Sequence, residues 1–173
     1  MTDASDRTLE LGAGSVSTDA GTSAQYLSFL LAGEEYAVDI LRVKEIRGWE
    51  GATPIPNMPP YVKGMINLRG AIVPIIDLRD RFKLPHQAYG PTTVVIVLQV
   101  RAGEKERTMG IVVDAVSEVH DVKHEGLRPT PDFGGAVDTA YIRGLATVDD
   151  KMVIILDIDA LLAAGTLKPS TGS

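Results

Sequence analysis

The stretch Tyr61–Phe82 reads YVKGMINLRGAIVPIIDLRDRF, and 80 residues later the chain repeats it as YIRGLATVDDKMVIILDIDALL, Tyr141–Leu162. Tyr, Gly, Val, Ile and Asp recur in register, without a gap. A repeat of this length that occurs only twice indicates a duplicated domain and not a solenoid. The matched apolar positions are predicted to face the core, for example Ile72 with Met152 and Ile76 with Leu156.

The repeat extends upstream, because YAVDILRVKEI at Tyr36–Ile46 aligns with MGIVVDAVSEV at Met109–Val119. The chain therefore reads as two β units of about 70 residues each. Short segments rich in β-branched residues, separated by Gly, Pro or charged turns, favour small barrels or a sandwich. Helices are expected only near Pro60–Lys63, directly after Leu78, and at Asp159–Ala164. The predicted strands are Tyr26–Leu31, Glu35–Ile40, Val43–Trp49, Met65–Leu68, Ala71–Leu78, Thr92–Arg101, Arg107–Val113, Val116–Val122 and Met152–Ile158.

Composition excludes several classes of protein. The 173 residues are 45% hydrophobic, which is ample for a core, yet no apolar run approaches the roughly 20 residues of a membrane-spanning helix. The start of the chain lacks the features of a secretory signal and there are no cysteines, so cytoplasm is the expected location. A net charge of −6 argues against nucleic acid as a partner. Residues 1–23 and 166–173, rich in small and polar residues, are predicted to be flexible tails.

Catalytic and metal-binding motifs are absent from the sequence. His120 and His124 form HDVKH without an evident third ligand, so we expect no metal site, and no phosphate loop or nucleophile elbow indicates a cofactor or an enzyme. Aspartates at strand ends are expected to satisfy turn N–H groups. They are Asp39, Asp77, Asp114 and Asp157. The remote alternative is a hydrolase that uses Asp77 and Asp157.

Glu45 and Arg69 lie in strand-like segments flanked by apolar residues, and we predict that they form a partly buried ion pair. In the second unit Glu118 replaces Glu45, but Asp149 replaces Arg69, so the pair belongs to the first unit alone. Two interpretations remain open: the pair fixes the packing of the first unit, or it marks a binding surface that the other unit lacks.

These residues lie in motifs that resemble a known family. EEYAVDILRVKEIRGW at Glu34–Trp49 and PNMPPYVKGMINLRGAIVPIIDLRDRF at Pro56–Phe82 closely resemble the CheW family of chemotaxis coupling proteins, and the likeness continues in order to Leu162. The resemblance implies an all-β fold of two five-stranded, SH3-like β-barrels around a shared core, with short helices. The domain would span residues 24–165, with the first barrel at roughly 24–88, the second at roughly 89–165, and the final elements open to sharing between them.

The function that the resemblance implies is that of a non-enzymatic adaptor. Such an adaptor couples the cytoplasmic tips of methyl-accepting chemotaxis receptors to the regulatory domain of the histidine kinase CheA, and is recruited to the inner face of the membrane through receptor arrays. It inserts no segment into the membrane and binds no nucleic acid. The alternative is the same adaptor role in another pathway, such as surface motility or gene regulation.

The resemblance also carries two sets of contact residues onto this chain. For the receptor tip, a helical hairpin lying in a groove, they are Ile40, Val43, Glu45, Gly64, Asn67, Arg69 and Val95. For the kinase they are Val116, Val119, Arg128, Asp132 and Phe133. Gly64 is expected to permit close approach of backbone, since it has no side chain. For Phe133 the alternative is an ordinary loop residue that covers the second core.

Overall fold

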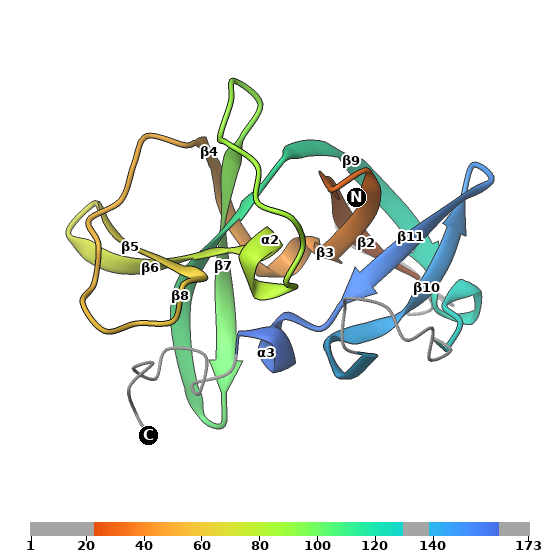
Figure 1. Cartoon of the computed structure of the whole chain (residues 1–173). Coiled ribbons are helices and arrows are strands. Elements are labelled where there is room, and N and C mark those ends of the chain that lie inside the picture. The colour runs from red at the N-terminus through yellow and green to blue at the C-terminus, as the bar shows by residue number, and fades with distance from the viewer. Residues whose placement is uncertain (1–22, 130–138, 163–173) are drawn as a thin grey trace, which may run out of the picture.

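The computed structural model describes residues 23–129 and 139–162, and these residues form mostly β-strands with five short helical segments (Figure 1). The first repeat contains β2 (Ser23–Leu31), β3 (Glu34–Asp39), η3 (Ile40–Arg42), β4 (Val43–Gly48), β5 (Val62–Leu68), β6 (Ala71–Asp77) and α2 (Leu78–Arg81). The second contains β7 (Val94–Ala102), β8 (Lys105–Val113), β9 (Ala115–Lys123), η4 (His124–Gly126), η5 (Thr139–Tyr141), β10 (Ile142–Val148), β11 (Lys151–Leu156) and α3 (Ile158–Leu161).

The strands form two five-stranded sheets with the same topology. One has the order β10-β11-β3-β2-β9 and the other β5-β6-β8-β7-β4, so each strand occupies the place of its repeat counterpart. In each sheet a single pair is parallel, β11 with β3 and β6 with β8, and the other pairs are antiparallel. The predicted all-β fold with two SH3-like subdomains is confirmed.

The two repeats exchange strands, which differs from the predicted division at residue 88. The first sheet combines β2 and β3 with β9, β10 and β11, whereas the second is the continuous segment from β4 to β8 (Figure 1). Each sheet therefore draws strands from both sides of residue 88. The reason is local: η3 leads the chain out of one sheet after β3, and the single residue Asp114 leads it back after β8.

The largest hydrophobic cluster lies between the two sheets. It joins Leu27, Phe29 and Tyr36 of one sheet to Ile76 and Ile96 of the other, with all five side chains nearly or fully buried. Burial of this size contributes several kcal/mol per large side chain at about 25 cal/mol per Å² of apolar area. Two smaller clusters lie within the separate subdomains, around Ala37 and Ile155 in one and around Val95 and Val97 in the other.

One predicted core pair is wrong. Ile76 and Leu156 are buried as expected, but Ile72 and Met152 are 59% and 58% exposed. Each lies four residues before its buried partner and so shares a strand face with it, but it stands near the start of β6 or β11, next to the hairpin turn and beyond the end of the core. The repeat thus preserves exposed apolar positions as well as buried ones.

Glycine and turn geometry explain why the two hairpins match. Arg69 and Asp149 occupy the same turn position with φ of 53° and 51°, a left-handed conformation that two-residue hairpin turns require. Gly64 and Gly144 lie at matching register shifts, where β5 and β10 receive isolated bridges from the preceding loops. The same local devices therefore build both hairpins.

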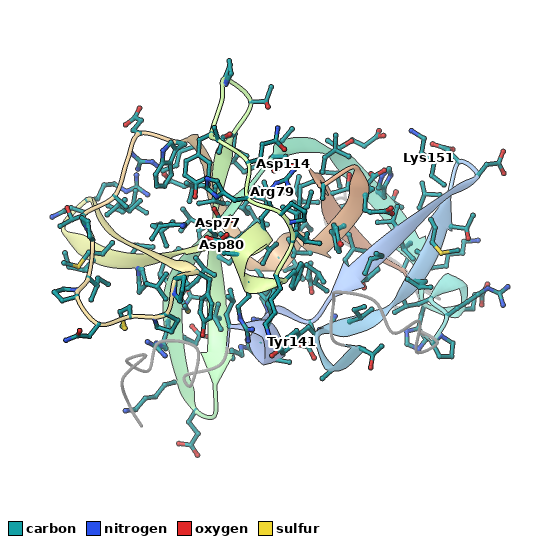
Figure 2. All side chains as sticks on the ribbon, in the orientation of Figure 1. Asp77, Arg79, Asp80, Asp114, Tyr141 and Lys151 are labelled. Atoms are coloured by element: carbon teal, nitrogen blue, oxygen red, sulfur yellow. The ribbon has the colours of Figure 1, made fainter. Side chains whose placement is uncertain are left out.

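Three arginines join the two subdomains. Arg42 on η3 pairs with Asp159 on α3 at 2.6 Å, and Arg79 on α2 pairs with Asp114 at 2.6 Å. Asp114 also accepts a hydrogen bond from the backbone N–H of Ala32, at the β2–β3 turn. Figure 2 shows Asp77, Arg79, Asp80 and Asp114 gathered around α2.

The third arginine, Arg81, lies between the repeat-related rings of Tyr61 and Tyr141, at 5.0 and 4.8 Å from their centroids. Guanidinium groups over aromatic faces are attracted by the ring quadrupole. Arg81 also donates a hydrogen bond of 2.8 Å to the Tyr141 hydroxyl. The contact between the two subdomains is therefore polar and aromatic at its surface and apolar within.

The predicted elements are mostly confirmed, with two corrections. The helix expected near Pro60–Lys63 is a turn that leads directly into β5, and β10 is a strand that the prediction lacked, although it aligns with β5 in the repeat. The other two predicted helices are present, with α2 beginning at Leu78 and α3 at Ile158, one residue before its predicted start. Among the described residues, no helix is both long and apolar enough to cross a membrane.

Candidate functional site

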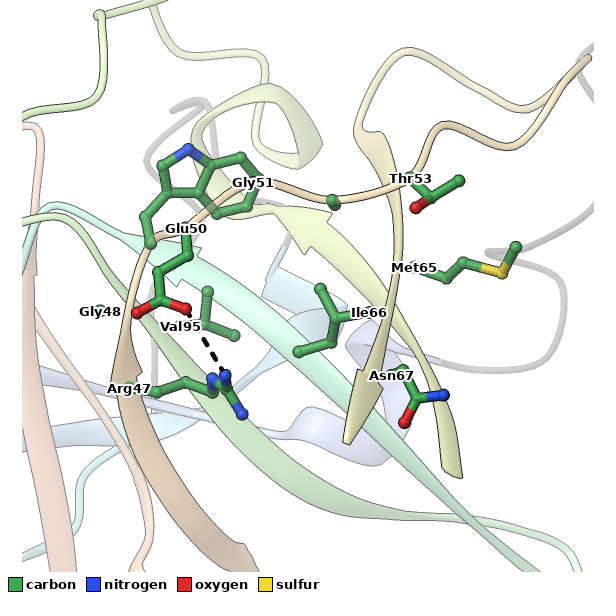
Figure 3. A pocket seen from close by; sticks show the side chains of 11 residues that line it. Arg47, Gly48, Glu50, Gly51, Thr53, Met65, Ile66, Asn67 and Val95 are labelled. Carbon is green, nitrogen blue, oxygen red and sulfur yellow. Dashed lines mark ion pairs between the residues drawn. The ribbon is translucent and has the colours of Figure 1, made fainter. Parts of the chain in front are cut away.

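A cleft of about 470 Å³ opens between β4 and β5, the two edge strands of the second sheet (Figure 3). These edges approach each other because the sheet curls, and the bridge between Thr53 and Met65 ties the connecting loop to β5. The cleft is lined by Arg47, Gly48, Trp49, Glu50, Gly51, Ala52 and Thr53 on one side, by Met65, Ile66 and Asn67 on the other, and by Val95.

Alternation along β4 supplies the charged wall of the cleft. Val43, Glu45 and Arg47 are half-buried, whereas Lys44 and Ile46 between them are exposed. Glu45 and Arg47 therefore lie on the same face of the strand as the cleft. The carboxylate of Glu45 contacts Arg47 at 3.4 Å, and Arg47 contacts Glu50 at 3.8 Å, the pair marked in Figure 3.

The predicted ion pair between Glu45 and Arg69 is confirmed, with 2.5 Å between Oε1 and Nη2. The hydrogen bond from Arg69 is the main cause that lowers the pKa of Glu45; partial burial opposes it and Arg47 adds to the lowering. The expectation of a partly buried pair is wrong for the arginine, which is 74% exposed. Arg69 is exposed because it occupies the tip of the β5–β6 hairpin. Such a pair contributes little to folding because water screens it.

Asn67 and Val95 lie at the cleft, as their assignment to a binding surface requires. Asn67 is exposed on β5, and its side-chain oxygen accepts a hydrogen bond of 2.8 Å from the backbone N–H of Gly70. This bond fixes the turn that carries Arg69. Val95 is only 3% exposed, so it forms the floor of the cleft and offers little surface of its own.

Gly64 has an intramolecular reason to lack a side chain. Its φ is +138°, and a Cβ atom there would lie 2.2 Å from the carbonyl oxygen of Thr53. Gly144 is its repeat counterpart and approaches the carbonyl oxygen of Arg128 in the same way, at 2.8 Å. Close approach of backbone was expected at Gly64, and the backbone that approaches is the chain's own.

Ile40 and Val43 do not line the cleft. Both are half-buried and pack against the large cluster between the two sheets. A contact of either residue with a partner stays a prediction.

The subdomain built on the first sheet, β10-β11-β3-β2-β9, holds the described residues that were assigned to the kinase surface. On β9, Val116 is half-buried and Val119 is 46% exposed, and Arg128 is exposed at its bridge to Leu145. Asp132 and Phe133 lie outside the described residues. This subdomain has no counterpart of the Glu45–Arg69 pair, because Asp149 occupies the turn position of Arg69.

His120 and the strand-end aspartates have structural partners. His120 is buried on β9 and its Nε2 lies 2.9 Å from a carboxylate oxygen of Glu35. Asp39, Asp77 and Asp157 accept hydrogen bonds from backbone N–H groups at the starts of η3, α2 and α3, which confirms the turn-satisfying role. Within residues 23–129 and 139–162, no group of three His, Asp or Glu side chains could hold a metal ion.

Comparison with known proteins decides the family. Residues 25–165 match the model of the CheW-like domain. The chain is 44% identical over 155 residues to the chemotaxis protein CheW of Klebsiella aerogenes, which covers 88% of this chain and 91% of that protein.

The chain belongs to the CheW family. It is also 32% identical over 142 residues to the chemotaxis protein CheW of Bacillus subtilis, covering 82% and 88% of the two chains. The crystal structure of the scaffolding protein TtCheW from Thermoanaerobacter tengcongensis matches with a TM-score of 0.74 at 34% identity, over 86% of this chain and 92% of that one. The resemblance seen in the sequence motifs is confirmed.

Several residues that line the cleft between β4 and β5 were not predicted from the sequence. Arg47, Trp49 and Ile66 line it, although none was assigned to a site. Arg47 could have been found from the period of two in a strand, since it lies two residues after Glu45. Trp49 is the chain's single tryptophan and directly follows β4, which is a second signal. Arg42, Arg79 and Asp159, which form ion pairs between the two subdomains, had no such signal in the sequence.

Proposed function

We propose that this CheW-family chain is a non-catalytic adaptor that couples methyl-accepting chemotaxis receptors to the histidine kinase CheA in the cytoplasm, at the inner face of the membrane. The cleft between β4 and β5 would receive the helical receptor tip. The observation that carries the proposal is the Glu45–Arg69 pair, which lies beside this cleft and has no counterpart in the subdomain that contains β9, β10 and β11. A feature confined to one half of a duplicated fold favours a role beyond folding.

The chemistry of the cleft fits a helix with mixed apolar and polar side chains. Ile66 offers apolar surface above a floor formed by Val95, while Arg47 and Glu50 supply charge to the wall and Glu45 pairs with Arg47. In helix-in-groove recognition, apolar anchors provide the buried area and polar pairs fix the register. Because Arg69 is mostly exposed, its guanidinium is accessible to a partner at little cost to the fold.

The kinase would contact the subdomain that contains β9 as well as the subdomain that contains the cleft. Val119 offers exposed apolar surface on the edge strand β9, and Arg128 lies exposed nearby in the chain, the composition of an interface anchor. Val116, Asp132 and Phe133 complete the proposed kinase surface. The same adaptor role in a surface-motility or gene-regulation pathway uses the same surfaces. Use of Asp77 and Asp157 in hydrolysis is disfavoured, because both cap helices and Asp77 is 2% exposed.

Co-sedimentation with receptor-containing vesicles, with and without CheA, tests the proposal. Replacing Arg69 by alanine should weaken receptor capture about tenfold, because it removes a partner-facing charge and frees Glu45, whereas kinase capture should stay within about twofold of the unchanged protein. Arg101→Ala is the matched control, since Arg101 is also an exposed hairpin arginine paired to a glutamate, Glu106, at 3.3 Å.

Two results would count against the adaptor role. One is an unchanged protein that neither sediments with receptors nor raises kinase autophosphorylation. The other is an Arg69→Ala protein that loses receptor and kinase capture equally together with a lower unfolding midpoint, which would assign the pair to packing.

A further inference from the structure

Trp49 forms part of the cleft wall, and its position depends on a contact outside the cleft. The residue is half-buried, and its indole ring meets the ring of Tyr89 edge to face, with centroids 4.7 Å apart and planes at 70°. Edge-to-face contacts of this kind add about 0.5–1.5 kcal/mol beyond the area that they bury. Among the described residues, Tyr89 is the aromatic side chain in ring contact with the indole.

Tyr89 lies in the segment Leu84–Thr93, which connects α2 to β7 without regular secondary structure. Its neighbours Pro85, Gln87, Ala88 and Gly90 are exposed, whereas Tyr89 is half-buried. The hydroxyl of Tyr89 donates a short hydrogen bond to Oδ2 of Asp77. Burial, followed by this hydrogen bond, raises the pKa of the Tyr89 hydroxyl above its ordinary value.

Asp77 is a rigid anchor for that hydroxyl. It is 2% exposed, and its other oxygen, Oδ1, accepts hydrogen bonds from the backbone N–H groups of Arg79 and Asp80 at 2.9 and 3.3 Å. The carboxylate is therefore fixed by the start of α2, and its remaining oxygen is directed at Tyr89. A hydrogen bond to a charged, buried acceptor is among the stronger ones in proteins.

The rest of the connecting segment is also held by side chains. Arg79 donates to the carbonyl oxygen of Pro85 at 2.8 Å, and the backbone N–H of Gly90 donates to Oγ1 of Thr93 at 2.8 Å. The backbone N–H of Trp49 donates to the carbonyl oxygen of Thr93 at 3.2 Å. The segment is thus tied to α2 at one end and to β4 at the other, with the ring of Tyr89 between them.

We propose that Tyr89, held by Asp77, is a positioning residue that keeps the Trp49 indole in place as a wall of the receptor cleft. This inference rests on the proposed function. Ordering a mobile side chain on binding costs entropy and weakens affinity. A cleft wall that is already fixed before binding avoids most of this cost. Tyr89 itself does not line the cleft, so it acts on a partner only through Trp49.

The first experiment needs no partner. Trp49 is the only tryptophan, so its fluorescence reports on this site alone. Tyr89→Phe removes the hydroxyl and keeps the ring; its emission should shift to the red and its quenching by acrylamide should increase. Tyr89→Leu removes the ring too and should do so more strongly. Tyr141→Phe is the matched control, because it removes a hydroxyl bound to Arg81 and leaves Trp49 untouched.

The second experiment measures capture by receptor vesicles and by CheA separately. Tyr89→Phe should raise the receptor Kd about threefold to tenfold, with kinase affinity unchanged, since only the cleft wall is loosened. An unfolding midpoint in urea confirms that the variants fold. If Trp49 emission and quenching in both Tyr89 variants equal those of the unchanged protein, the inference is overturned, whatever the vesicles show.

The outcomes also separate the two proposals. Altered Trp49 quenching in a protein that binds no receptor at all supports the positioning role and rejects the proposed function. Altered quenching with unchanged receptor affinity, in a chain whose unmutated form binds receptors, overturns the link between Tyr89 and the cleft.

Discussion

At the scale of the residue, Glu45 and Arg69 show how exposure decides what an ion pair does. The pair exists as the sequence predicts, but its arginine is 74% exposed at a hairpin tip. A buried pair would tie the site to folding, since a stranded charge is costly; an exposed one leaves the guanidinium available to a partner. The exposure of Arg69 therefore favours recognition over packing as the role of the pair.

Gly64 is the residue whose replacement should be most costly for folding at this site. An added Cβ would collide with Thr53 O at 2.2 Å, and φ of +138° strains any other residue. Gly64→Ala should lower the free energy of unfolding by roughly 2–5 kcal/mol, measured in urea. Gly70→Ala is the control, because Gly70 also has a positive φ, +91°, but has open space around it; a loss near 1 kcal/mol is expected there. Equal losses at the two positions would contradict steric collision as the cause.

At the scale of the element, α2 and α3 show the same solution twice. Each has only four residues, far too few to be stable alone. Asp77 and Asp157 cap them at matching repeat positions, and the buried Leu78 and Ile158 dock them on the core. Capping by an acidic side chain satisfies N–H groups that the helix leaves free. A four-residue helix therefore forms where the repeat supplies both a capping aspartate and a buried apolar residue.

The ion pair between Arg42 on η3 and Asp159 on α3 should make the free energy of unfolding depend on pH. The hydrogen bond from Arg42 is the main cause that lowers the pKa of Asp159 below its ordinary value of 3.8, with opposition from burial and further lowering from Arg101. A lowered pKa in the folded state gives stability that is present above 3.8 and is lost as the pH falls through the lower, folded-state pKa. The free energy of unfolding of the unchanged protein should therefore fall as the pH drops from about 3.8 through the folded-state pKa of Asp159.

Asp159→Asn tests this dependence. It should lower the free energy of unfolding by about 1–2 kcal/mol at neutral pH and flatten its fall in acid, because the coupled proton is gone. Urea titrations followed by circular dichroism from pH 7 to pH 2 measure both. Glu106→Gln is the control, since the Arg101–Glu106 pair is 64% and 51% exposed and should contribute little. A variant with an unchanged slope in acid would show that Asp159 is not responsible.

At the scale of the whole molecule, strand exchange makes the two repeats interdependent. β2 and β3 of the first repeat complete a sheet with β9, β10 and β11 of the second, and β4, β5 and β6 complete theirs with β7 and β8. The large cluster between the sheets then unites both. The chain therefore has two repeats, but neither repeat contains a whole sheet.

Fragments test this interdependence. Residues 24–88 and 89–165, produced separately, should show no cooperative unfolding in urea, because each would carry strands without their neighbours. Residues 43–113, which contain the full sheet from β4 to β8, should retain more β-sheet signal in circular dichroism than residues 24–88. A cooperative transition in either half alone would contradict the exchanged arrangement.

The sequence by itself determined the duplication, the all-β class, the family and the ion pair, because each of these is written in local patterns: register between repeats, β-branched runs and specific motifs. The helix-capping aspartates follow from the same local chemistry. Only the tertiary structure decided which repeat supplies which strand, since the pairing of β2 with β9 depends on contacts some 90 residues apart, as between Ser28 and Glu118, and leaves no local signature. It also decided that Ile72 and Met152 face solvent, and that Tyr89 supports Trp49 beside the cleft, because burial and contact arise only when distant segments pack together.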